Sequence, residues 1–285
     1  MRNTILFIIK EDEYLKFRHE FFCEILRKSF KLTTLVILKD WKKEFLNTPF
    51  NSKKYKATIV WGEIFDTKLL NEIKTSNFIF IPMADFVHSK KLAWWFRLRN
   101  FKTICFSKRL SEALIKHNFR LFNFLYVPNS NKNIVKLPKK ISEKKVLNVY
   151  VSGEINSKTQ LIINKLFKFQ KYNIHDKLQK NTHLYLSLNK YSGLDLDFLK
   201  AISMGVIPIV PNNYNLNDYV FHNKTGYLYK YDLPLFIDFS NINEIQANLL
   251  NFINVNSHRW KIKSKQVDGI IRLKNHSSLD YDKKN

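Results

Sequence analysis

Residues 189–211 contain a loop, a short helix, a glycine and an apolar strand in immediate succession, and this order constrains the fold more than any other part of the sequence. Residues 192–193 form the turn of the loop, and Asp197 is a predicted N-cap for a helix with apolar side chains at helical spacing. Gly205 can take the left-handed conformation that ends such a helix, and residues 206–210 are a β-branched run typical of a buried parallel strand. A loop leading into a helix N-terminus offers backbone N–H groups to an anion such as a phosphate.

Short apolar runs alternate with helical patterns along the rest of the chain, which predicts an α/β protein with parallel sheets. Strands are expected over residues 4–9, 32–38, 57–61, 77–81, 102–106, 124–127, 146–151, 183–188 and 206–210. Helices are expected over residues 15–26, 67–73, 107–115, 162–169, 242–253 and 257–273, and residues 10–13 form a polar loop. Strand–helix–strand units of this kind have right-handed crossovers and bring the carboxyl ends of their strands to one edge, where ligands bind.

The 189–211 segment resembles the nucleotide-sugar-binding signature of glycosyltransferases with the two-domain GT-B fold, especially the large retaining family known as glycosyl transferases group 1. The positions that fall in register with the signature are Gly193, Leu196, Leu199, Ala201, Gly205 and Pro208. Ser192 and Lys200 stand where the family has its two glutamates. Residues 223–229 resemble the Thr-Gly turn that follows the signature, and residues 103–130 resemble the end of the family's first domain.

The resemblance implies two Rossmann-like domains that face each other across a cleft. Residues 1–133 would form the acceptor domain, 134–145 a linker rich in Lys, Asn and Pro, and 146–256 the nucleotide-sugar domain. Residues 257–285 would form a helix that crosses back to the first domain and a polar tail. Because the second domain is short for this family, a strand–helix unit between Lys171 and Thr182 is expected to be missing.

The activity implied by the resemblance is transfer of a sugar from a nucleotide-sugar donor to a hydroxyl of a glycan or glycolipid, in bacterial surface polysaccharide or lipooligosaccharide synthesis. Such enzymes use no metal and no further cofactor, because a helix N-terminus and basic side chains meet the charge that grows on the diphosphate. The residues expected to bind the donor here are Gly153, Lys158, Ser192, Gly193, Leu194, Asp195 and Lys200.

Several of these residues have a plainer interpretation. Lys158 has the position of a solvated lysine in the first turn of a helix, and Lys200 either reaches a phosphate or faces solvent. Glu154 replaces the arginine that the family places beside the diphosphate. The Asp195-Leu-Asp197 triplet spells a metal-binding motif of another glycosyltransferase fold, but a hard cation needs more oxygen ligands than this triplet supplies.

Three residues at predicted strand ends in the first half are candidates for catalysis: His88, Asp85 and Glu63. The resembling family often carries a histidine near the reacting sugar at the position of His88. An inverting transfer needs a carboxylate as general base for the acceptor hydroxyl, whereas a retaining transfer does not, and the sequence leaves both open.

The chain is strongly basic, with 48 Lys and Arg against 24 Asp and Glu, a formal net charge of +24. This charge suits an anionic partner, although a general bias toward lysine explains part of it. Residues 90–102 interleave basic and aromatic side chains, which suits an anionic membrane surface or glycolipid; a core-packing helix and nucleic-acid binding are the other interpretations, the last the least favoured.

The remaining composition favours a cytoplasmic protein, resting at most on the inner face of the membrane. No apolar run reaches the ~18 residues of a membrane span. The two cysteines, Cys23 and Cys105, lie in apolar patterns typical of reduced core thiols. Loss of both signature glutamates also leaves open a non-catalytic GT-B-like scaffold that partners another transferase.

Overall fold

The computed structural model describes residues 4–15, 18–37, 55–62, 77–83, 90–131, 133–137, 146–189, 196–212 and 216–273. The chain divides into two compact units. The first contains Met1–Phe124 together with Lys261–Asn285, and the second contains Leu125–Trp260. The C-terminal end of the chain therefore belongs with its N-terminal half.

The first unit is built on a six-stranded parallel sheet with the strand order β2-β1-β3-β4-β5-β6. Its strands are β1 Thr4–Lys10, β2 Lys31–Ile37, β3 Ala57–Gly62, β4 Phe78–Pro82, β5 Lys102–Cys105 and β6 Arg120–Asn123. Its helices are α1 Glu11–Leu15, α2 Glu20–Ser29, α6 Leu92–Phe96, α7 Lys108–Ile115 and α11 Lys265–Arg272.

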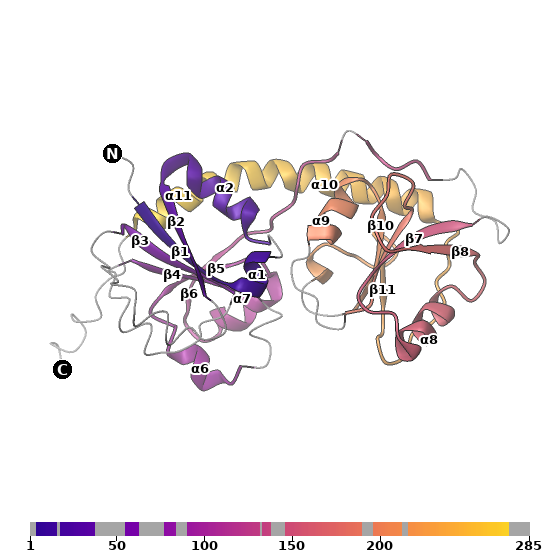
Figure 1. Ribbon diagram of the computed structural model, residues 1–285, viewed down its shortest axis with the longest axis horizontal. Helices are drawn as coiled ribbons and strands as arrows, with labels where there is room; N and C mark the ends of the chain where they lie inside the picture. The colour runs from indigo at the N-terminus through magenta and orange to yellow at the C-terminus, as the bar shows by residue number, and fades with distance from the viewer. Residues whose placement is uncertain are drawn as a thin grey trace. The chain divides into compact units, whose positions relative to one another are not determined.

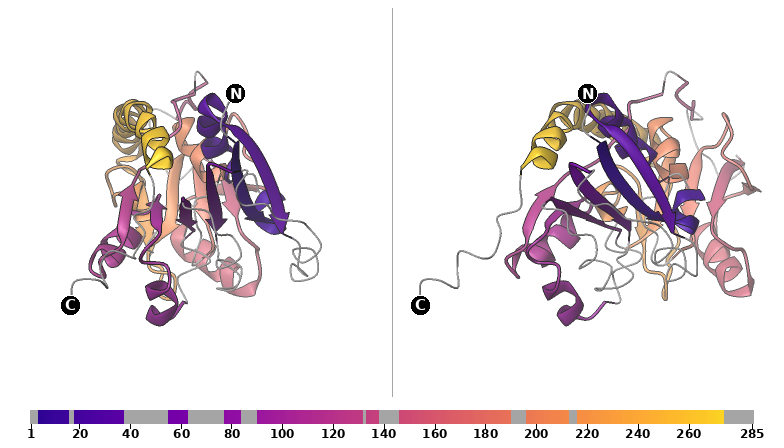
Figure 2. Two further views of the ribbon diagram at one scale, coloured as in Figure 1. Left: turned by 90° about the vertical axis from the view of Figure 1, so that its left-hand side faces the viewer. Right: turned by 60° about the vertical axis from the view of Figure 1, so that its left-hand side comes forward.

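Helices cover both faces of this sheet (Figures 1 and 2). On one face α2 and α11 pack against apolar strand residues, and on the other α6 and α7 do so. The strands are apolar on both sides, as expected for a sheet that is buried twice. Cys23 and Cys105 are both buried free thiols, as predicted.

The second unit contains a five-stranded parallel sheet with the order β11-β10-β9-β7-β8. Its strands are β7 Leu147–Ser152, β8 Tyr172–His175, β9 Leu184–Ser187, β10 Ile207–Pro211 and β11 Tyr227–Tyr229. Its helices are α8 Ser157–Leu166, α9 Leu196–Ser203, the 3-10 turn Leu216–Asp218 and α10 Ile242–Lys263, whose last residues belong to the first unit. Two parallel-sheet α/β domains are thus present, as predicted.

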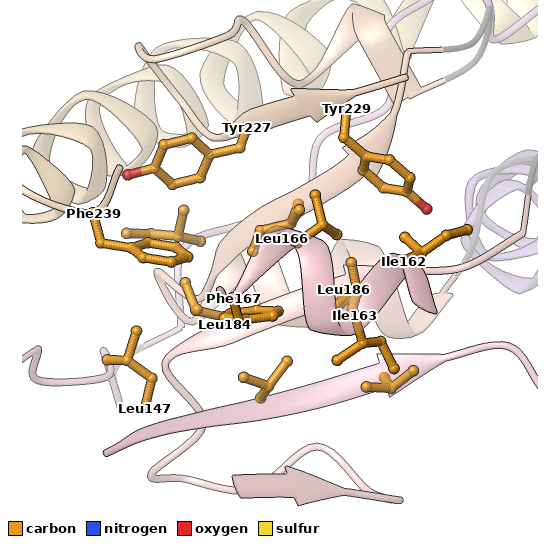
Figure 3. Packing of buried hydrophobic residues seen from close by; sticks show 14 of the residues in the cluster. Leu147, Ile162, Ile163, Leu166, Phe167, Leu184, Leu186, Tyr227, Tyr229 and Phe239 are labelled. Carbon is orange, nitrogen blue, oxygen red and sulfur yellow. The ribbon is translucent and has the colours of Figure 1, made fainter. Parts of the chain in front are cut away.

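One face of the second sheet packs on α8 and the start of α10 (Figure 3). Ile162, Ile163 and Leu166 of α8 meet alternate residues of β7 and β9, and Phe167 stacks on Phe239 with 5.6 Å between ring centroids. The opposite face carries α9, whose Phe198 packs edge to face on Tyr185. The sheet is therefore sealed on both sides and exposes functional groups mainly at its edges.

Gly205 ends α9 as predicted. Its φ is +74°, its N–H donates to the carbonyl of Ile202 at 2.9 Å, and the N–H of Val206 donates to Ala201 at 3.0 Å. These two bonds form a Schellman motif, which lets β10 begin directly after the helix. The short connection fixes where α9 lies on the sheet.

The last strand of the first sheet was predicted at the wrong place, because β6 spans Arg120–Asn123 and not residues 124–127. Its partner β5 has only four residues, so the ladder begins at Lys102 opposite Arg120. The N–H of Phe124 closes it by donating to the carbonyl of Cys105 at 2.9 Å. Residues 124 and 127 are buried after the chain has left the sheet, which explains their strand-like pattern.

Three further expectations are corrected by the structure. Residues 11–15 form the helix α1 in place of the predicted polar loop, with acidic residues in its first turn. The strand–helix unit expected to be missing after residue 171 is only half missing, because β8 is present and pairs with β7, while residues 176–183 form no helix. The predicted break between two C-terminal helices lies at Ser264 and not near residue 255, because residues 242–263 keep one continuous buried stripe.

A buried lysine closes the C-terminal end of α11. The Lys102 ammonium, fully buried in β5, donates to the carbonyl of Ile270 at 2.9 Å, to the carbonyl of Leu273 and to the side chain of Asn77. Asn77 in turn donates to the carbonyl of Ile271. A cation at a helix C-terminus satisfies carbonyls that have no partner within the helix and is favoured by the helix dipole. This cluster attaches the end of the chain to the first sheet.

Burial lowers the pKa of Lys102 to about 8, and the positive charge of Arg120 acts in the same direction. The folded state then binds fewer protons than the unfolded state between about pH 8 and pH 10, so this group adds stability as the pH rises through that window. Urea titrations of the wild type and of Lys102→Met give the difference between their unfolding free energies at each pH. We expect this difference, wild type minus variant, to rise by about 2 kcal/mol from neutral pH to about pH 9.5. A pH-independent difference would show that the three oxygens keep the amine fully protonated.

Candidate functional site

The strand order of the second sheet reverses at β7. The loops that follow β7 and β9 therefore leave toward opposite faces of the sheet. The first strand, β7, pairs with the second, β8, on one side and with the third, β9, on the other. In open α/β sheets, ligands bind outside the carboxyl ends of the strands at such a switch point. The loops that follow β7 and β9 therefore define the candidate site.

Gly153 follows β7 and lies against the residues that follow β9. Ser152 is in register with Ser187, and the N–H of Leu188 donates to the carbonyl of Ser152 at 2.8 Å. A Cβ atom at position 153 would lie 3.1 Å from Oδ1 of Asn189 and 3.2 Å from Cβ of Leu188. The φ of Gly153 is +115°, a conformation that other residues rarely adopt. Glycine thus lets the two loops approach closely at the edge of the sheet.

The loop from Gly153 into α8 is fixed by a reciprocal cap. Oδ1 of Asn156 accepts from the N–H of Thr159 at 3.1 Å, and Oγ1 of Thr159 accepts from the N–H of Asn156 at 2.7 Å. The Thr159 hydroxyl also donates to the carbonyl of Glu154 at 2.9 Å. This capping box holds the start of α8 at the sheet edge without a ligand.

Lys158 lies in the first turn of α8 and is exposed. Its Nζ is 5.3 Å from the centre of the Tyr231 ring, which follows β11 at the same edge of the sheet. This cation–π contact holds the ammonium group at the carboxyl ends of the strands. The positive charge is therefore available to an anion bound at this edge.

Asp197 does not cap α9, contrary to prediction, because the helix begins one residue earlier, at Leu196. Its carboxylate lies within the first turn and accepts a hydrogen bond from the Tyr150 hydroxyl at 2.8 Å. Tyr150 belongs to β7, so this bond joins the start of α9 to the strand that carries Gly153. Lys200 is exposed on the outer side of α9.

The structure thus brings Gly153 and Lys158 together at one sheet edge and places Lys200 on the helix beside it. Four predicted donor residues, Ser192, Gly193, Leu194 and Asp195, lie outside the described residues, as do the predicted catalytic residues Glu63, Asp85 and His88. In the described ranges, no three His, Cys, Asp or Glu side chains are placed to share a metal ion. Metal independence stays a prediction.

Sequence reasoning missed Asn189, Tyr150 and Tyr231 as neighbours of these residues. The alternation of β7 indicates that Tyr150 faces away from Val149 and Val151, but only the fold shows that it meets Asp197. The contact of Tyr231 with Lys158 joins positions 73 residues apart in the chain, and no local pattern reports it.

In the first unit the switch point lies between β1 and β3. Near the end of β3 the fully buried Trp61 packs against His19, with 6.4 Å between ring centroids. Burial lowers the pKa of His19, whose Nε2 is 3.4 Å from Oε1 of Glu20. Nδ1 of His19 and Nε1 of Trp61 are both buried, and neither has a hydrogen-bond partner among the residues that the structure describes. No local sequence pattern indicates that His19 and Trp61 lie together.

Residues 90–102 are only partly a surface segment. Trp95 of α6 and Leu98, which follows that helix, are buried in the core of the first unit, and Lys102 is buried in β5. Phe96, Arg97 and Arg99 are exposed. None of the helices in the described ranges has the length and apolar character needed to cross a membrane.

No protein-family model matches the sequence, and a search of curated proteins finds no match. Among solved structures, the chain is similar to a glycosyltransferase from Rickettsia africae ESF-5, with a TM-score of 0.60 and 12% identity over 95% of this chain and 98% of that chain. It is also similar to Anabaena Alr3699/HepE in complex with UDP-glucose, with a TM-score of 0.56 and 11% identity over 93% and 99% of the two chains. A third similar structure is the lipopolysaccharide outer core galactosyltransferase WaaB in its apo form, with a TM-score of 0.54 and 14% identity over 94% of each chain. The fold of this protein is accordingly GT-B.

The conformation of Gly153 gives a direct test of the edge geometry. We expect Gly153→Ala to destabilise the protein by about 1–3 kcal/mol, because alanine must adopt a strained φ and its Cβ meets two neighbours. Gly269→Ala is the matched control, since a Cβ in the middle of α11 would meet nothing within 4 Å. That change should stabilise the protein by about 0.5–1 kcal/mol. Thermal or urea unfolding of both variants measures the effect, and a neutral Gly153→Ala would contradict the described loop.

Proposed function

We propose that the protein is a glycosyltransferase that takes its sugar from a nucleotide-diphosphate donor bound at the β7–β9 edge. The observation that supports this most is the close approach of Gly153 to Asn189 at the switch point of a parallel sheet. The segment that resembles the nucleotide-sugar-binding signature, residues 189–211, begins at this same edge of the second sheet. A similar structure holds UDP-glucose, which supports a nucleotide-sugar donor.

The chemistry follows from charge. When the bond between the sugar and the diphosphate breaks, negative charge grows on the leaving phosphate, and groups that meet this charge lower the barrier. Lys158 supplies a full positive charge at the sheet edge, and its cation–π contact with Tyr231 limits the conformations of the side chain. The backbone of the loop after Asn189 supplies N–H donors in this proposal, and no metal is needed.

The finer features of the proposal rest on the sequence resemblance. The transferred group is a hexose or a related sugar, the acceptor is a glycan or glycolipid hydroxyl, and the pathway is bacterial surface polysaccharide or lipooligosaccharide synthesis. The similarity to WaaB supports the lipopolysaccharide setting. The enzyme would act in the cytoplasm, where the exposed part of residues 90–102 could contact an anionic membrane face.

Nucleotide binding is the first test. We expect UDP or another nucleoside diphosphate, added with EDTA, to raise the melting temperature, because a ligand at about 100 times its Kd adds about 2.7 kcal/mol of stability. Lys158→Met should weaken the binding by about tenfold, since it removes one charged contact worth about 1.4 kcal/mol. Lys165→Met is the control, because this lysine is exposed at the other end of the same helix.

The outcomes separate the alternatives. If no nucleoside diphosphate stabilises the protein, the proposal is wrong. Binding without any donor hydrolysis or transfer would instead support a non-catalytic scaffold, for which the specific observation is that Lys200 replaces the acidic residue of the family signature. Turnover of a nucleotide sugar in the presence of EDTA would establish a metal-independent transferase.

A further inference from the structure

A groove of about 620 Å³ lies in the first unit, between α2 and the junction where α10 ends and α11 begins. The helices α2 and α11 lie side by side there (Figure 1). The apolar side chains that line the groove are buried or half-buried, whereas three lysines of its lining, Lys28, Lys261 and Lys265, are exposed. The groove is therefore open to solvent along a margin that carries positive charge.

These lysines have no acidic partner. Within the described ranges, Lys28, Lys261 and Lys265 form no ion pair with a carboxylate. Asp268 also lines the groove, but its carboxylate accepts from the Arg272 guanidinium at 2.9 and 3.3 Å. Like charges that gather without counter-charges repel one another, so an anion bound beside them is favoured.

The surface around the groove has the same sign of charge. On α2, Glu20 is occupied by Arg27, whose Nη1 donates to its carboxylate at 2.8 Å. Glu24 is then the acidic residue left on that helix, and it faces an excess of cations, since Lys263 is exposed beside the three lysines of the groove. A local charge imbalance of this kind attracts anionic partners more strongly than the general bias of the chain does.

An exposed aliphatic side chain lies among these lysines. Ile262 is 55% exposed, and Lys261 and Lys263 flank it in the sequence. The neighbouring aromatic residue is turned inward, because Trp260 is 8% exposed and packs on Tyr126 with 5.3 Å between ring centroids. Lysines around an exposed aliphatic group are typical of a helix that lies in a membrane interface. Single-stranded nucleic acid instead needs exposed rings on which bases stack.

We infer that Lys28 and residues 261–265 form a surface that binds an anionic lipid bilayer. The ammonium groups lie against lipid phosphates, and Ile262 enters the boundary between the head groups and the acyl chains. A dissolved phosphate would satisfy the lysines but leave Ile262 in water, whereas a bilayer provides for both. The inference goes beyond the proposed function, because it needs neither a nucleotide nor a transfer reaction.

The test measures binding of the full chain to sedimenting vesicles without any nucleotide. Vesicles of phosphatidylcholine with about 30% phosphatidylglycerol are compared with vesicles of phosphatidylcholine alone. We expect the anionic vesicles to bind at least about tenfold more tightly at about 50 mM salt. This preference should decrease at about 300 mM salt, because screening shortens the range of the attraction.

Two variants locate the surface. Lys261→Gln combined with Lys265→Gln should weaken binding by about 30-fold, since each lysine near an anionic surface contributes about fivefold. Ile262→Ser should weaken it by about fivefold, because it removes an apolar group that enters the bilayer. Neither change should lower the melting temperature, since all three side chains are exposed.

A matched control is needed because the net charge of +24 attracts the whole protein to anionic vesicles. Lys177→Gln combined with Lys180→Gln removes the same charge from exposed positions in the second unit and should change binding by less than about threefold. Arg97→Gln combined with Arg99→Gln tests the exposed part of residues 90–102 and should have a smaller effect than the groove pair.

The inference is overturned if either of these two pairs weakens binding as much as the groove pair does. It is also wrong if neutral vesicles bind equally well, or if Ile262→Ser has no effect. Displacement of the vesicles by a single-stranded oligonucleotide that binds Ile262→Ser normally would indicate a nucleic-acid surface instead. The groove pair should keep its stabilisation by nucleoside diphosphate, so failure here is distinguishable from failure of the proposed function.

Discussion

Both sheets depend on one constraint, which is that parallel strands must all end at the same edge. In each unit the first strand lies between the second and the third, so the connections on its two sides leave toward opposite faces. The loops that follow the first and third strands then separate at one point of the edge. In the second unit those loops carry Gly153 and Asn189, and their close approach follows from the strand order together with a residue that has no Cβ.

Buried polar groups hold helices in place against the two sheets. Lys102 and Asn77 lie in or beside central strands, where a lone polar side chain would be costly, and both satisfy carbonyls at the end of α11. The Tyr150 hydroxyl forms a different link, donating to the Asp197 carboxylate in the first turn of α9 and so joining that helix to β7. Each pair joins a helix terminus to the sheet, so the helices are positioned by specific hydrogen bonds as well as by apolar packing.

The sequence predicted the parts of this structure that follow from local periodicity. The two parallel-sheet domains and the Gly205 stop are correct, because β-branched runs and helical spacing are properties of neighbouring residues. The position of β6 was wrong because the length of a strand is set by its partner, and β5 has only four residues. The role of Asp197 was wrong for a similar reason, since Tyr150 lies 47 residues away and competes for the carboxylate. Contacts such as Lys158 with Tyr231 depend on the order of the strands, which local patterns do not contain.

The three tyrosines of β11 and of the residues that follow it make three different kinds of contact. Tyr227 and Tyr229 face the same core because side chains two apart share a face, and Tyr231 stacks on Tyr229 with 6.5 Å between ring centroids. Tyr229 is satisfied by the backbone of β9 and supports the sheet, whereas Tyr231 contacts the lysine of the proposed donor edge. Tyr227 does neither, and its buried hydroxyl has no hydrogen-bond partner in the described part of the chain. Since a phenylalanine would fill the same space without an unsatisfied polar atom, packing alone does not explain a tyrosine at this position.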